Sequence, residues 1–373
     1  MNKIKVMTIA GTRPEGIKMA PLIKELNKRE EIEHIFCSTG QHKEMLNQVL
    51  DIFDIKPDID LNIFEKGQSL SQVTCRSLLG LEEVLKDYKP DLVLVQGDTT
   101  TVFSGALAAF YQKIDIGHVE AGLRSHDMFS PYPEEINRKL TGILTKFCFA
   151  VTDTNVQNLK NEGIEDKKIY KVGNTVIDAV RIIADNSYKF ECEELNNLDF
   201  EEQKVILLTC HRRENLGQYM DQIFSGIRKV ADANKDAVVV FPMHLNPLVR
   251  EQAKKHLDGN ARIKLIEPLN YRDVVNLESK CYMIMTDSGG LQEEGPAFGK
   301  PVLVLRKETE RPEGIEVGTA KLTGVLEGNV IKDMETLLNN KIEYNKMAKA
   351  VNPYGDGNTS KKIVDIIIEN YKK

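Results

Sequence analysis

The chain has 373 residues, of which 41% are hydrophobic and 28% charged, with a formal net charge of -6 at pH 7. One hydrophobic core rarely grows beyond about 250–300 residues, so this length predicts two domains. The acidic balance argues against general nucleic-acid binding, although a local group of cations and backbone N–H groups can still hold a small anion.

The sequence contains no apolar run close to the roughly 18 residues of a transmembrane helix. Residues 1–6 lead directly into a strand-like segment, so we expect a cytoplasmic protein with no membrane partner. The 6 cysteines are far apart and form no C-x-x-C pair, and the 7 histidines show no H-E-x-x-H spacing. This pattern favours buried free thiols and indicates no metal site.

Short apolar runs alternate with segments of helical period along the first half of the chain. Strands are expected at 4–10, 32–39, 92–96, 114–119, 147–151 and 169–172, with amphipathic helices such as 14–28 and 102–111 between them. This alternation is typical of a doubly wound parallel sheet that is buried on both faces.

The same pattern repeats after a polar, acidic segment at 184–203. Strands are expected at 205–209, 237–242, 262–266, 282–286 and 301–305, with a helix at 216–233. A last helix at about 358–372 follows a turn-rich stretch and could cross back to the first half. We therefore expect an α/β protein of two Rossmann-like domains that face a cleft. The first comprises residues 1–172 plus 355–373, and the second 173–354.

Ligands of open α/β sheets bind beyond the carboxyl ends of the strands, and the unusual polar sequences of this chain fall at such ends. The first is the turn from Gly11 to Glu15, where a helix N-terminus offers free N–H groups to an anion. Arg13 adds a forked cation there, and Lys18 follows one turn later. An ordinary turn with a solvated arginine would have the same sequence.

Three carboxylates are also predicted to meet at this sheet edge. Asp98 follows one strand, Glu120 ends the next, and Glu134 starts a helix beside Glu135. Asp98 could be a helix cap, although Thr99 or Thr100 could take that place. Glu135 could merely complement the helix dipole, so the pair of glutamates is ambiguous by itself. Three converging carboxylates suit acid–base chemistry better than packing.

The second half has its own polar strand ends. His211, followed by two arginines, suits contact with a phosphate, whereas His244 fits a structural role equally well. The turn 286–290 contains Ser-Gly-Gly, which lets backbone N–H groups approach a phosphate, and Glu294 could accept hydrogen bonds from a ribose diol. The sequence 295–300 has the wrong spacing for a Walker A loop, which excludes an ATPase of that type.

Many of these segments together resemble the non-hydrolysing UDP-N-acetylglucosamine 2-epimerases. In chain order from residue 11 to about residue 318 they include GTRPEGIKMAPL, TGQH, GDTTT, HVEAGLRS, PYPEEINR, HRRENLG, HLNP, DSGGLQEE and TERPEG. The resemblance implies a GT-B fold, usually as a homodimer. It also implies interconversion of UDP-N-acetylglucosamine (UDP-GlcNAc) and UDP-N-acetylmannosamine (UDP-ManNAc) without a nicotinamide or metal cofactor. The family mechanism eliminates UDP to give 2-acetamidoglucal and then adds UDP back.

The resemblance carries roles onto individual residues. The acid–base carboxylates correspond to Asp98, Glu120 and Glu134 of the first domain, and the essential histidine corresponds to His211. The residues expected to bind the substrate are Arg13, Lys18, Leu269, Ser288, Gly289, Gly290, Glu294 and Arg311. Leu269 begins the loop on the uracil side, in which Val274 stands at the usual aromatic position.

Some bacterial members of the family also bind a second, activating UDP-GlcNAc. The positions associated with that site are Gln41, His42, Gln68, Glu134, Arg212 and His244. The arginine that precedes the glutamine in regulated relatives is Gly67 here, and glycine replaces neither its charge nor its reach. The sequence thus predicts attenuated regulation.

Other functions fit the sequence less well. An epimerase of a more decorated UDP-sugar, such as a diacetamido uronic acid, is disfavoured by the opening motif, and hydrolysing relatives differ in the same motif. A GT-B glycosyltransferase would need an acceptor surface and would have no use for three carboxylates. A non-catalytic nucleotide-binding module would give them no role at all.

Overall fold

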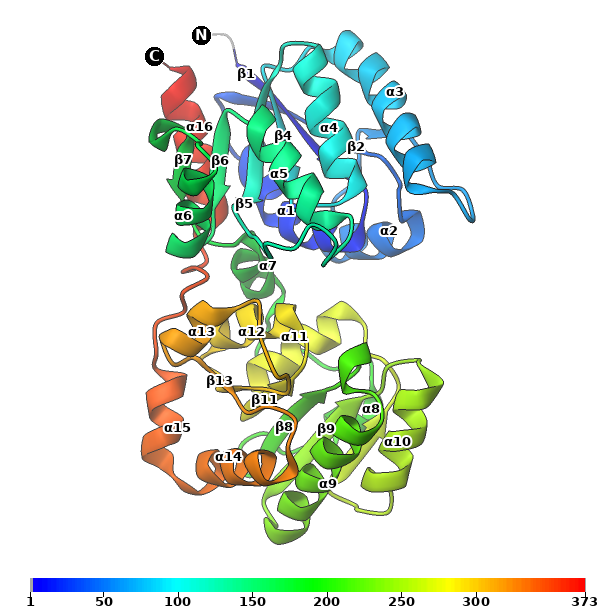
Figure 1. Ribbon diagram of the computed structural model, residues 1–373, viewed down its shortest axis with the longest axis vertical. Helices are drawn as coiled ribbons and strands as arrows, with labels where there is room; N and C mark the ends of the chain where they lie inside the picture. Colours follow the sequence, from blue (N-terminus) through cyan, green and yellow to red (C-terminus); the bar gives the residue numbers. More distant parts are fainter. Residues whose placement is uncertain (1–2, 373) are drawn as a thin grey trace. The chain divides into compact units, whose positions relative to one another are not determined.

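The computed structural model describes residues 3–372, whose contacts divide the chain into two compact units (Figure 1). The first unit contains residues 3–182 and 354–372, and the second contains residues 183–353. The boundary expected at residue 172 lies ahead of helix α7 (Thr175–Ile183), whereas the contacts divide the chain near the end of that helix.

The first unit is built on a parallel sheet of 7 strands in the order β3-β2-β1-β4-β5-β6-β7. Its strands are β1 (Ile4–Ala10), β2 (Ile32–Ser38), β3 (Ile59–Asp60), β4 (Leu92–Gln96), β5 (Asp115–Ala121), β6 (Phe147–Ala150) and β7 (Ile169–Lys171). The six strands predicted from apolar runs are confirmed to within one or two residues at each end. Strand β3 has only 2 residues, too few for a periodic signal.

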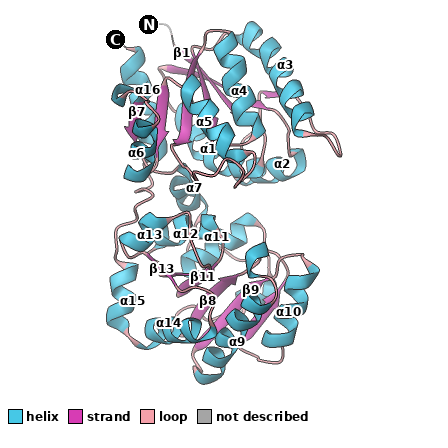
Figure 2. Ribbon diagram, viewed as in Figure 1, coloured by secondary structure: helices cyan, strands magenta, loops and turns pink. Residues whose placement is uncertain are grey.

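Helices lie along both faces of this sheet (Figure 2). They are α1 (Arg13–Asn27), α2 (Lys43–Ile52), α3 (Leu70–Tyr88), α4 (Thr100–Tyr111), α5 (Glu134–Leu144), α6 (Asp153–Asn161), α7 and α16 (Thr359–Tyr371). The last of these packs on α1, and its Asp365 accepts a 2.7 Å hydrogen bond from Arg29. The expected return of the last helix to the first half of the chain is thus confirmed.

The second unit repeats the design with a parallel sheet of 6 strands in the order β10-β9-β8-β11-β12-β13. The strands are β8 (Lys204–Thr209), β9 (Ala237–Pro242), β10 (Ile263–Ile266), β11 (Met283–Thr286), β12 (Val302–Val304) and β13 (Ala320–Leu322). The helices are α8 (Glu193–Asn196), α9 (Gln218–Ala233), α10 (Pro247–Leu257), α11 (Tyr271–Lys280), α12 (Gly289–Glu294), α13 (Pro312–Glu316), α14 (Glu327–Asn339) and α15 (Lys341–Ala348). Helix α9 begins two residues later than predicted, because Gly217 before it has a positive φ of 81°.

The order of strands determines where a ligand can approach each sheet. In the first unit the direction of winding reverses between β1 and β4, and in the second between β8 and β11. The loops after these strands leave in opposite directions and open a crevice at the carboxyl edge of the sheet. Residues 11–13 and 97–99 lie at the first such point, and residues 210–217 and 287–288 at the second. Within residues 3–372, no helix is both long and apolar enough to cross a membrane.

Candidate active site

The turn between β1 and α1 is fixed by a buried glutamate, Glu15. Its carboxyl group accepts hydrogen bonds from the Gly11 N–H at 2.6 Å, the Thr12 hydroxyl at 3.0 Å and the Thr99 hydroxyl. The turn is tight, because a Cβ added at Gly11 would lie 2.1 Å from the Thr39 hydroxyl. Burial raises the pKa of Glu15 to about 7. Glu15 thus joins the loops after β1 and β4, a role that was missed because an acidic residue in a first helical turn usually only complements the dipole.

Glu120 is held at the end of β5 in an unusual backbone conformation. Its φ is +66°, and the register between β5 and β6 shifts beside it. Its carboxylate accepts a 2.7 Å hydrogen bond from the Gln96 amide and forms an ion pair with Lys18. A left-handed residue other than glycine costs energy and persists where its surroundings hold it, most often at functional sites. The structure thus brings the predicted residues Lys18 and Glu120 into direct contact.

Asp98, the second predicted carboxylate, is oriented by helix α5. Its side chain accepts a 2.8 Å hydrogen bond from Arg138 Nε, and its backbone carbonyl accepts one of 2.9 Å from the Asn137 amide. The cap of helix α4 is Thr99, whose side chain accepts from the Val102 N–H. The Asp98 carboxylate is therefore not used as that cap.

The two adjacent glutamates at the start of α5 have different environments. Glu135 is fully buried and accepts hydrogen bonds from the N–H groups of Ser125 at 3.0 Å and His126 at 3.3 Å, and from Arg138 at 3.3 Å. Glu134 Oε2 is also buried, but has no hydrogen-bond partner among the described residues. Glu135 therefore stabilises the loop before α5, while Glu134 keeps an oxygen for a proton or a ligand.

Arg13, the predicted cation of the first turn, is half-buried at the start of α1. Among residues 3–372 its guanidinium group has no hydrogen-bond or ion-pair partner. Its charge is thus not neutralised by a neighbouring carboxylate and remains available to an anionic ligand.

The second unit is organised around Asp287, whose role the sequence alone does not predict. Asp287 is fully buried after β11, and its Oδ2 accepts hydrogen bonds from the N–H groups of His211 at 2.7 Å and Arg212 at 2.8 Å. The same oxygen accepts a 3.1 Å bond from the Asn215 amide. One carboxylate therefore shapes the entire loop after β8.

His211 lies in this loop with its side chain 38% exposed. Its Nδ1 is 3.5 Å from Asp287 Oδ1, and its ring stacks on that of His244 with centroids 5.1 Å apart. Burial lowers the pKa of His211, and the nearby Asp287 carboxylate opposes this effect. The structure thus brings together two predicted histidines and presents one of them to a ligand.

The predicted phosphate turn, Ser288 to Gly290, begins helix α12 beside two other candidates. A Cβ added at Gly290 would lie 3.3 Å from Glu294 Oε1, and one at Gly289 would lie 3.9 Å from the Arg311 guanidinium. Arg311 is in turn paired with Glu293. Ser288, Gly289, Gly290, Glu294 and Arg311 therefore form one cluster.

The remaining predicted positions have more ordinary surroundings. Leu269 packs against the hydrophobic core of the second unit, and Val274 is half-buried on α11. In the first unit, Gln41 accepts a 2.7 Å hydrogen bond from the Thr101 hydroxyl, and Gln68 accepts one of 3.3 Å from Arg76. His42 is exposed before α2.

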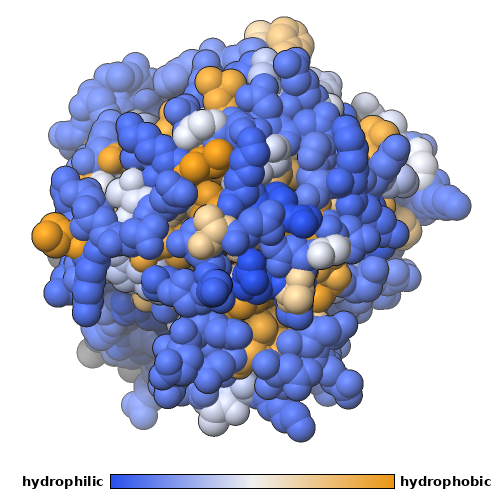
Figure 3. All heavy atoms as spheres, turned by 90° about the horizontal axis from the view of Figure 1, so that it is seen from below, coloured by the Kyte–Doolittle hydropathy of each residue, from blue (hydrophilic) through white to orange (hydrophobic). Residues whose placement is uncertain are grey.

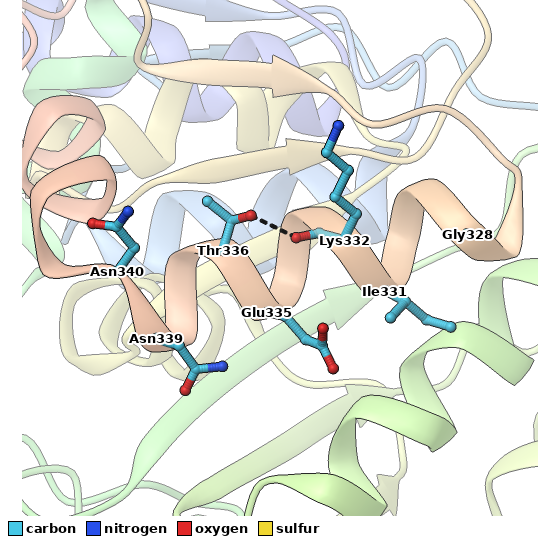
Figure 4. A pocket seen from close by; sticks show the side chains of 7 residues that line it. All are labelled: Gly328, Ile331, Lys332, Glu335, Thr336, Asn339 and Asn340. Carbon is cyan, nitrogen blue, oxygen red and sulfur yellow. Dashed lines mark hydrogen bonds between the residues drawn. The ribbon is translucent and has the colours of Figure 1, made fainter.

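A pocket elsewhere on the second unit lies over helix α14 (Figure 4). Its lining contains none of the candidate residues and consists of Gly328, Ile331, Lys332, Glu335, Thr336, Asn339 and Asn340. Within the described part of the chain, no group of three or more histidine, cysteine or acidic side chains is placed to hold a metal ion.

A family model described as UDP-N-acetylglucosamine 2-epimerase matches residues 24–368. The chain belongs to the UDP-N-acetylglucosamine 2-epimerase family. The UDP-N-acetylglucosamine 2-epimerase of Bacillus subtilis is 50% identical over 371 residues, which cover 100% of this chain and 97% of the relative. That of Escherichia coli K12 is 46% identical over 372 residues, covering 98% and 99%.

Solved structures of such epimerases have the same fold. The structure of the Neisseria meningitidis UDP-GlcNAc 2-epimerase bound to UDP-GlcNAc matches with a TM-score of 0.84 at 46% identity, covering 98% of this chain and 100% of that one. The Methanocaldococcus jannaschii UDP-GlcNAc 2-epimerase in complex with UDP-GlcNAc and UDP matches with a TM-score of 0.76 at 37% identity, covering 98% and 99%. The predicted family and the two-domain, Rossmann-like fold are confirmed.

Proposed function

We propose that this protein is a UDP-GlcNAc 2-epimerase that works by elimination and re-addition of UDP. The observation that carries the proposal is the Glu120 carboxylate, held in a left-handed conformation against Lys18 and Gln96 at the carboxyl edge of the first sheet. A relative that matches this chain over nearly its full length at 50% identity is a UDP-N-acetylglucosamine 2-epimerase, which supports UDP-GlcNAc as the substrate.

The chemistry explains why carboxylates and cations are both needed. The proton on carbon 2 of the sugar is weakly acidic, so its removal must be coupled to breaking of the C1–O bond. The electron pair of the C2–H bond becomes the C1=C2 double bond of 2-acetamidoglucal, and that of the C1–O bond leaves with UDP. In the return step UDP re-forms the C1–O bond, and a proton reaches carbon 2 from the other face.

We assign the proton transfers to the first unit. Glu120 contacts Lys18 and Gln96, and Asp98 contacts Arg138, so both carboxylates are held in place to act as proton acceptors. Glu134 has a buried oxygen without a partner among the described residues, which suits a group that carries a proton to the substrate.

We assign UDP binding to the second unit. The Ser288–Gly290 turn and Arg311 offer N–H groups and a positive charge to a diphosphate, and His211 can add a hydrogen bond. Glu294 is placed to accept from the ribose hydroxyls. Hydrogen bonds to the leaving oxygen become stronger as negative charge develops on it, and this lowers the barrier to elimination.

We also propose that two copies associate through the first unit. Helices α3, α4 and α5 are neighbours, and they expose the apolar side chains Leu79, Phe110, Tyr111, Leu140 and Ile143. By contrast, Figure 3 shows a face on which hydrophilic residues predominate. An exposed apolar surface of this kind suits a protein–protein interface. Light scattering should give about twice the mass of one chain, and Ile143→Asp should lower it; a monomeric parent protein would contradict the assignment.

Regulation by a second UDP-GlcNAc should be weak. Gly67 offers no cation beside Gln68, and Arg76, which reaches Gln68, is also paired with Glu65. The neighbouring charge of Arg76 is therefore partly neutralised and cannot fully replace an arginine at position 67.

The test uses the pure protein with no added NAD or metal ion. Starting from either UDP-GlcNAc or UDP-ManNAc, we expect the same final mixture of both. Steady release of free N-acetylmannosamine and UDP would instead indicate a hydrolase, and transfer to an added sugar would indicate a glycosyltransferase.

A further inference from the structure

Helix α6 contacts the loop that follows Glu120 at the end of strand β5. Ala121 packs with Leu159 of α6 in one buried apolar cluster. A Cβ added at Gly122 would lie 2.3 Å from the Asn155 carbonyl oxygen, so the loop and the helix are in direct backbone contact. Only glycine fits there, and the φ of +89° at Gly122 favours it as well. The chain therefore rests on α6 within two residues of Glu120.

Two polar side chains on one face of α6 reinforce this contact. The Asn158 amide donates a 3.0 Å hydrogen bond to the Gly122 carbonyl, and Glu162, one helical turn further on, accepts two bonds of 2.7 Å from Arg124. The Arg124 side chain is fully buried, while that of Glu162 is 32% exposed. Because a buried guanidinium without a partner is strongly disfavoured, loss of Glu162 would drive Arg124 toward water and displace the loop.

Glu120 lies between two points at which the backbone is fixed. Strand β5 has one residue more than β6 here, so Glu120 forms a bulge. Before it, the Val119 carbonyl accepts a 3.0 Å hydrogen bond from the Gly97 N–H, and after it the Gly122 carbonyl is held by α6. A bulge aims its side chain according to the backbone on either side, and a left-handed residue relaxes unless its surroundings hold it. The direction of the Glu120 side chain thus depends on the contact with α6.

We propose that Asn158 and Glu162 are positioning residues for the epimerisation, which fix the loop after β5 on α6 and so hold the Glu120 carboxylate at the sugar carbon from which it takes a proton. This rests on the proposed role of Glu120. The contacts of Glu120 with Lys18 and Gln96 orient the end of its side chain, whereas α6 sets the backbone from which that side chain starts. A displacement of about 1 Å in a catalytic site can lower the rate by about 100-fold.

The test measures kcat and, by calorimetry, the affinity for UDP in full-length variants. Glu162→Ala should lower kcat by about 10- to 100-fold and leave UDP affinity unchanged, since UDP binding is assigned to the second unit. Glu162→Gln keeps an acceptor for Arg124 and should restore much of this loss. Asn158→Leu should have a smaller effect, because the Asn155 amide also donates to the Gly122 carbonyl, at 3.4 Å.

The same helix supplies matched controls. Lys160→Ala breaks an exposed ion pair of α6, and Gln157→Leu breaks an exposed hydrogen bond. Neither contact reaches the loop after β5, so both variants should keep the kcat of the parent. A fall in kcat equal to that of Glu162→Ala in either control would show general damage to α6 and overturn the inference.

A double-mutant cycle with Glu120→Gln tests whether Glu162 acts through Glu120. In that background Glu162→Ala should lower the residual turnover by no more than about twofold, because the carboxylate that it positions is already absent. A further loss as large as that in the parent background would mean that Glu162 acts independently of Glu120. Where the turnover of Glu120→Gln is too low to measure, the recovery of kcat in Glu162→Gln decides instead.

The outcomes separate this inference from the proposed function. Parent-like kcat in Glu162→Ala and Asn158→Leu, or an equal loss of UDP affinity, would overturn the positioning role even though the parent protein epimerises UDP-GlcNAc. Failure of Glu162→Gln to recover more activity than Glu162→Ala would overturn it as well. If the parent protein itself does not epimerise UDP-GlcNAc, the proposed function fails.

Discussion

Asp287 Oδ2 accepts the backbone N–H of His211 at 2.7 Å, while Asp287 Oδ1 lies 3.5 Å from the ring Nδ1 of the same histidine. One buried carboxylate thus fixes the backbone of His211 and lies beside its ring. A proton on Nδ1 that faces Asp287 leaves Nε2 as the nitrogen that meets a ligand. The carboxylate also favours the charged form of the ring, against the effect of burial.

Asp287→Asn should separate these two effects. The amide oxygen can still accept the backbone N–H groups, but the charge that favours protonated His211 is lost. We expect turnover to fall by about tenfold, which corresponds to about one pKa unit of lost charge stabilisation, with a changed pH profile. The measurements are the pH dependence of kcat and the thermal midpoint. Asp232→Asn on the surface of α9 is the control, and a parent-like pH profile of Asp287→Asn would exclude the proposed coupling.

The adjacent glutamates of α5 offer a matched pair of variants. Glu134→Gln should lower turnover by about 10²–10⁴-fold with little change in stability, because a positioned acid or base contributes that much. Glu135→Ala should instead destabilise the fold by about 1–3 kcal/mol or more, since it leaves the N–H groups of Ser125 and His126 without an acceptor. Urea unfolding and steady-state kinetics measure both. The assignment is wrong if the two effects are exchanged.

Because Lys18 and Glu120 form an ion pair, substituting either residue should reduce the activity of the enzyme. Glu120→Gln and Asp98→Asn should each reduce kcat by about 10²–10⁴-fold while UDP still binds, because both residues belong to the first unit. Lys18→Met should reduce kcat as well, since it removes the cation that stabilises ionised Glu120. Lys5→Met, which breaks the exposed pair with Glu33, is the control. Near-normal turnover in Glu120→Gln and Asp98→Asn would refute their roles.

Glu15 predicts a specific pH dependence of stability. Its pKa is raised from 4.5 to about 7, so the folded protein holds this proton more tightly than the unfolded chain. The resulting stabilisation is complete below the unfolded pKa and is lost as the pH rises to about 7. The parent protein should therefore lose up to about 3 kcal/mol of unfolding free energy between acidic and neutral pH through this group. Glu15→Gln should lack this loss, so its unfolding free energy should rise relative to that of the parent over the same pH range. Urea unfolding across this range measures it, with exposed Glu44→Gln as control; a difference independent of pH would contradict the shift.

Attenuated regulation predicts the time course of epimerisation when pure UDP-ManNAc is the starting substrate. We expect little or no lag, and Gly67→Arg should introduce a lag that traces of UDP-GlcNAc abolish, because the new cation could bind a diphosphate. Progress curves with and without added UDP-GlcNAc provide the measurement. A long lag in the parent protein that micromolar UDP-GlcNAc removes would show full regulation despite Gly67.

The sheets were largely predictable because strands buried on both faces appear as continuous apolar runs, as in Leu92–Gln96 and Ala237–Pro242. Strands β3 and β13, with 2 and 3 residues, depend on pairing with a neighbour rather than on their own pattern. The capping of α4 by Thr99 was among the expected alternatives, since threonine is a preferred cap.

The supporting contacts of the site were not predictable in the same way. Asp287 and His211 are 76 residues apart in sequence, and Lys18 and Glu120 are 102 apart, so only the folded sheet brings each pair together. The left-handed conformation of Glu120 likewise follows from the shifted register of β5 and β6. Glu135 has hydrogen-bond donors and Glu134 Oε2 has none among the described residues, and this difference depends on which side of α5 the preceding loop covers.

The most direct test of the central claim is the fate of the proton on carbon 2. The pure protein is incubated with UDP-GlcNAc in D₂O, and carbon 2 is followed by NMR. Elimination and re-addition predict that deuterium enters carbon 2 of both UDP-GlcNAc and UDP-ManNAc as they equilibrate, because the proton removed exchanges with solvent before another is added. Formation of UDP-ManNAc that keeps its original hydrogen at carbon 2, or no UDP-ManNAc at all, would contradict the account.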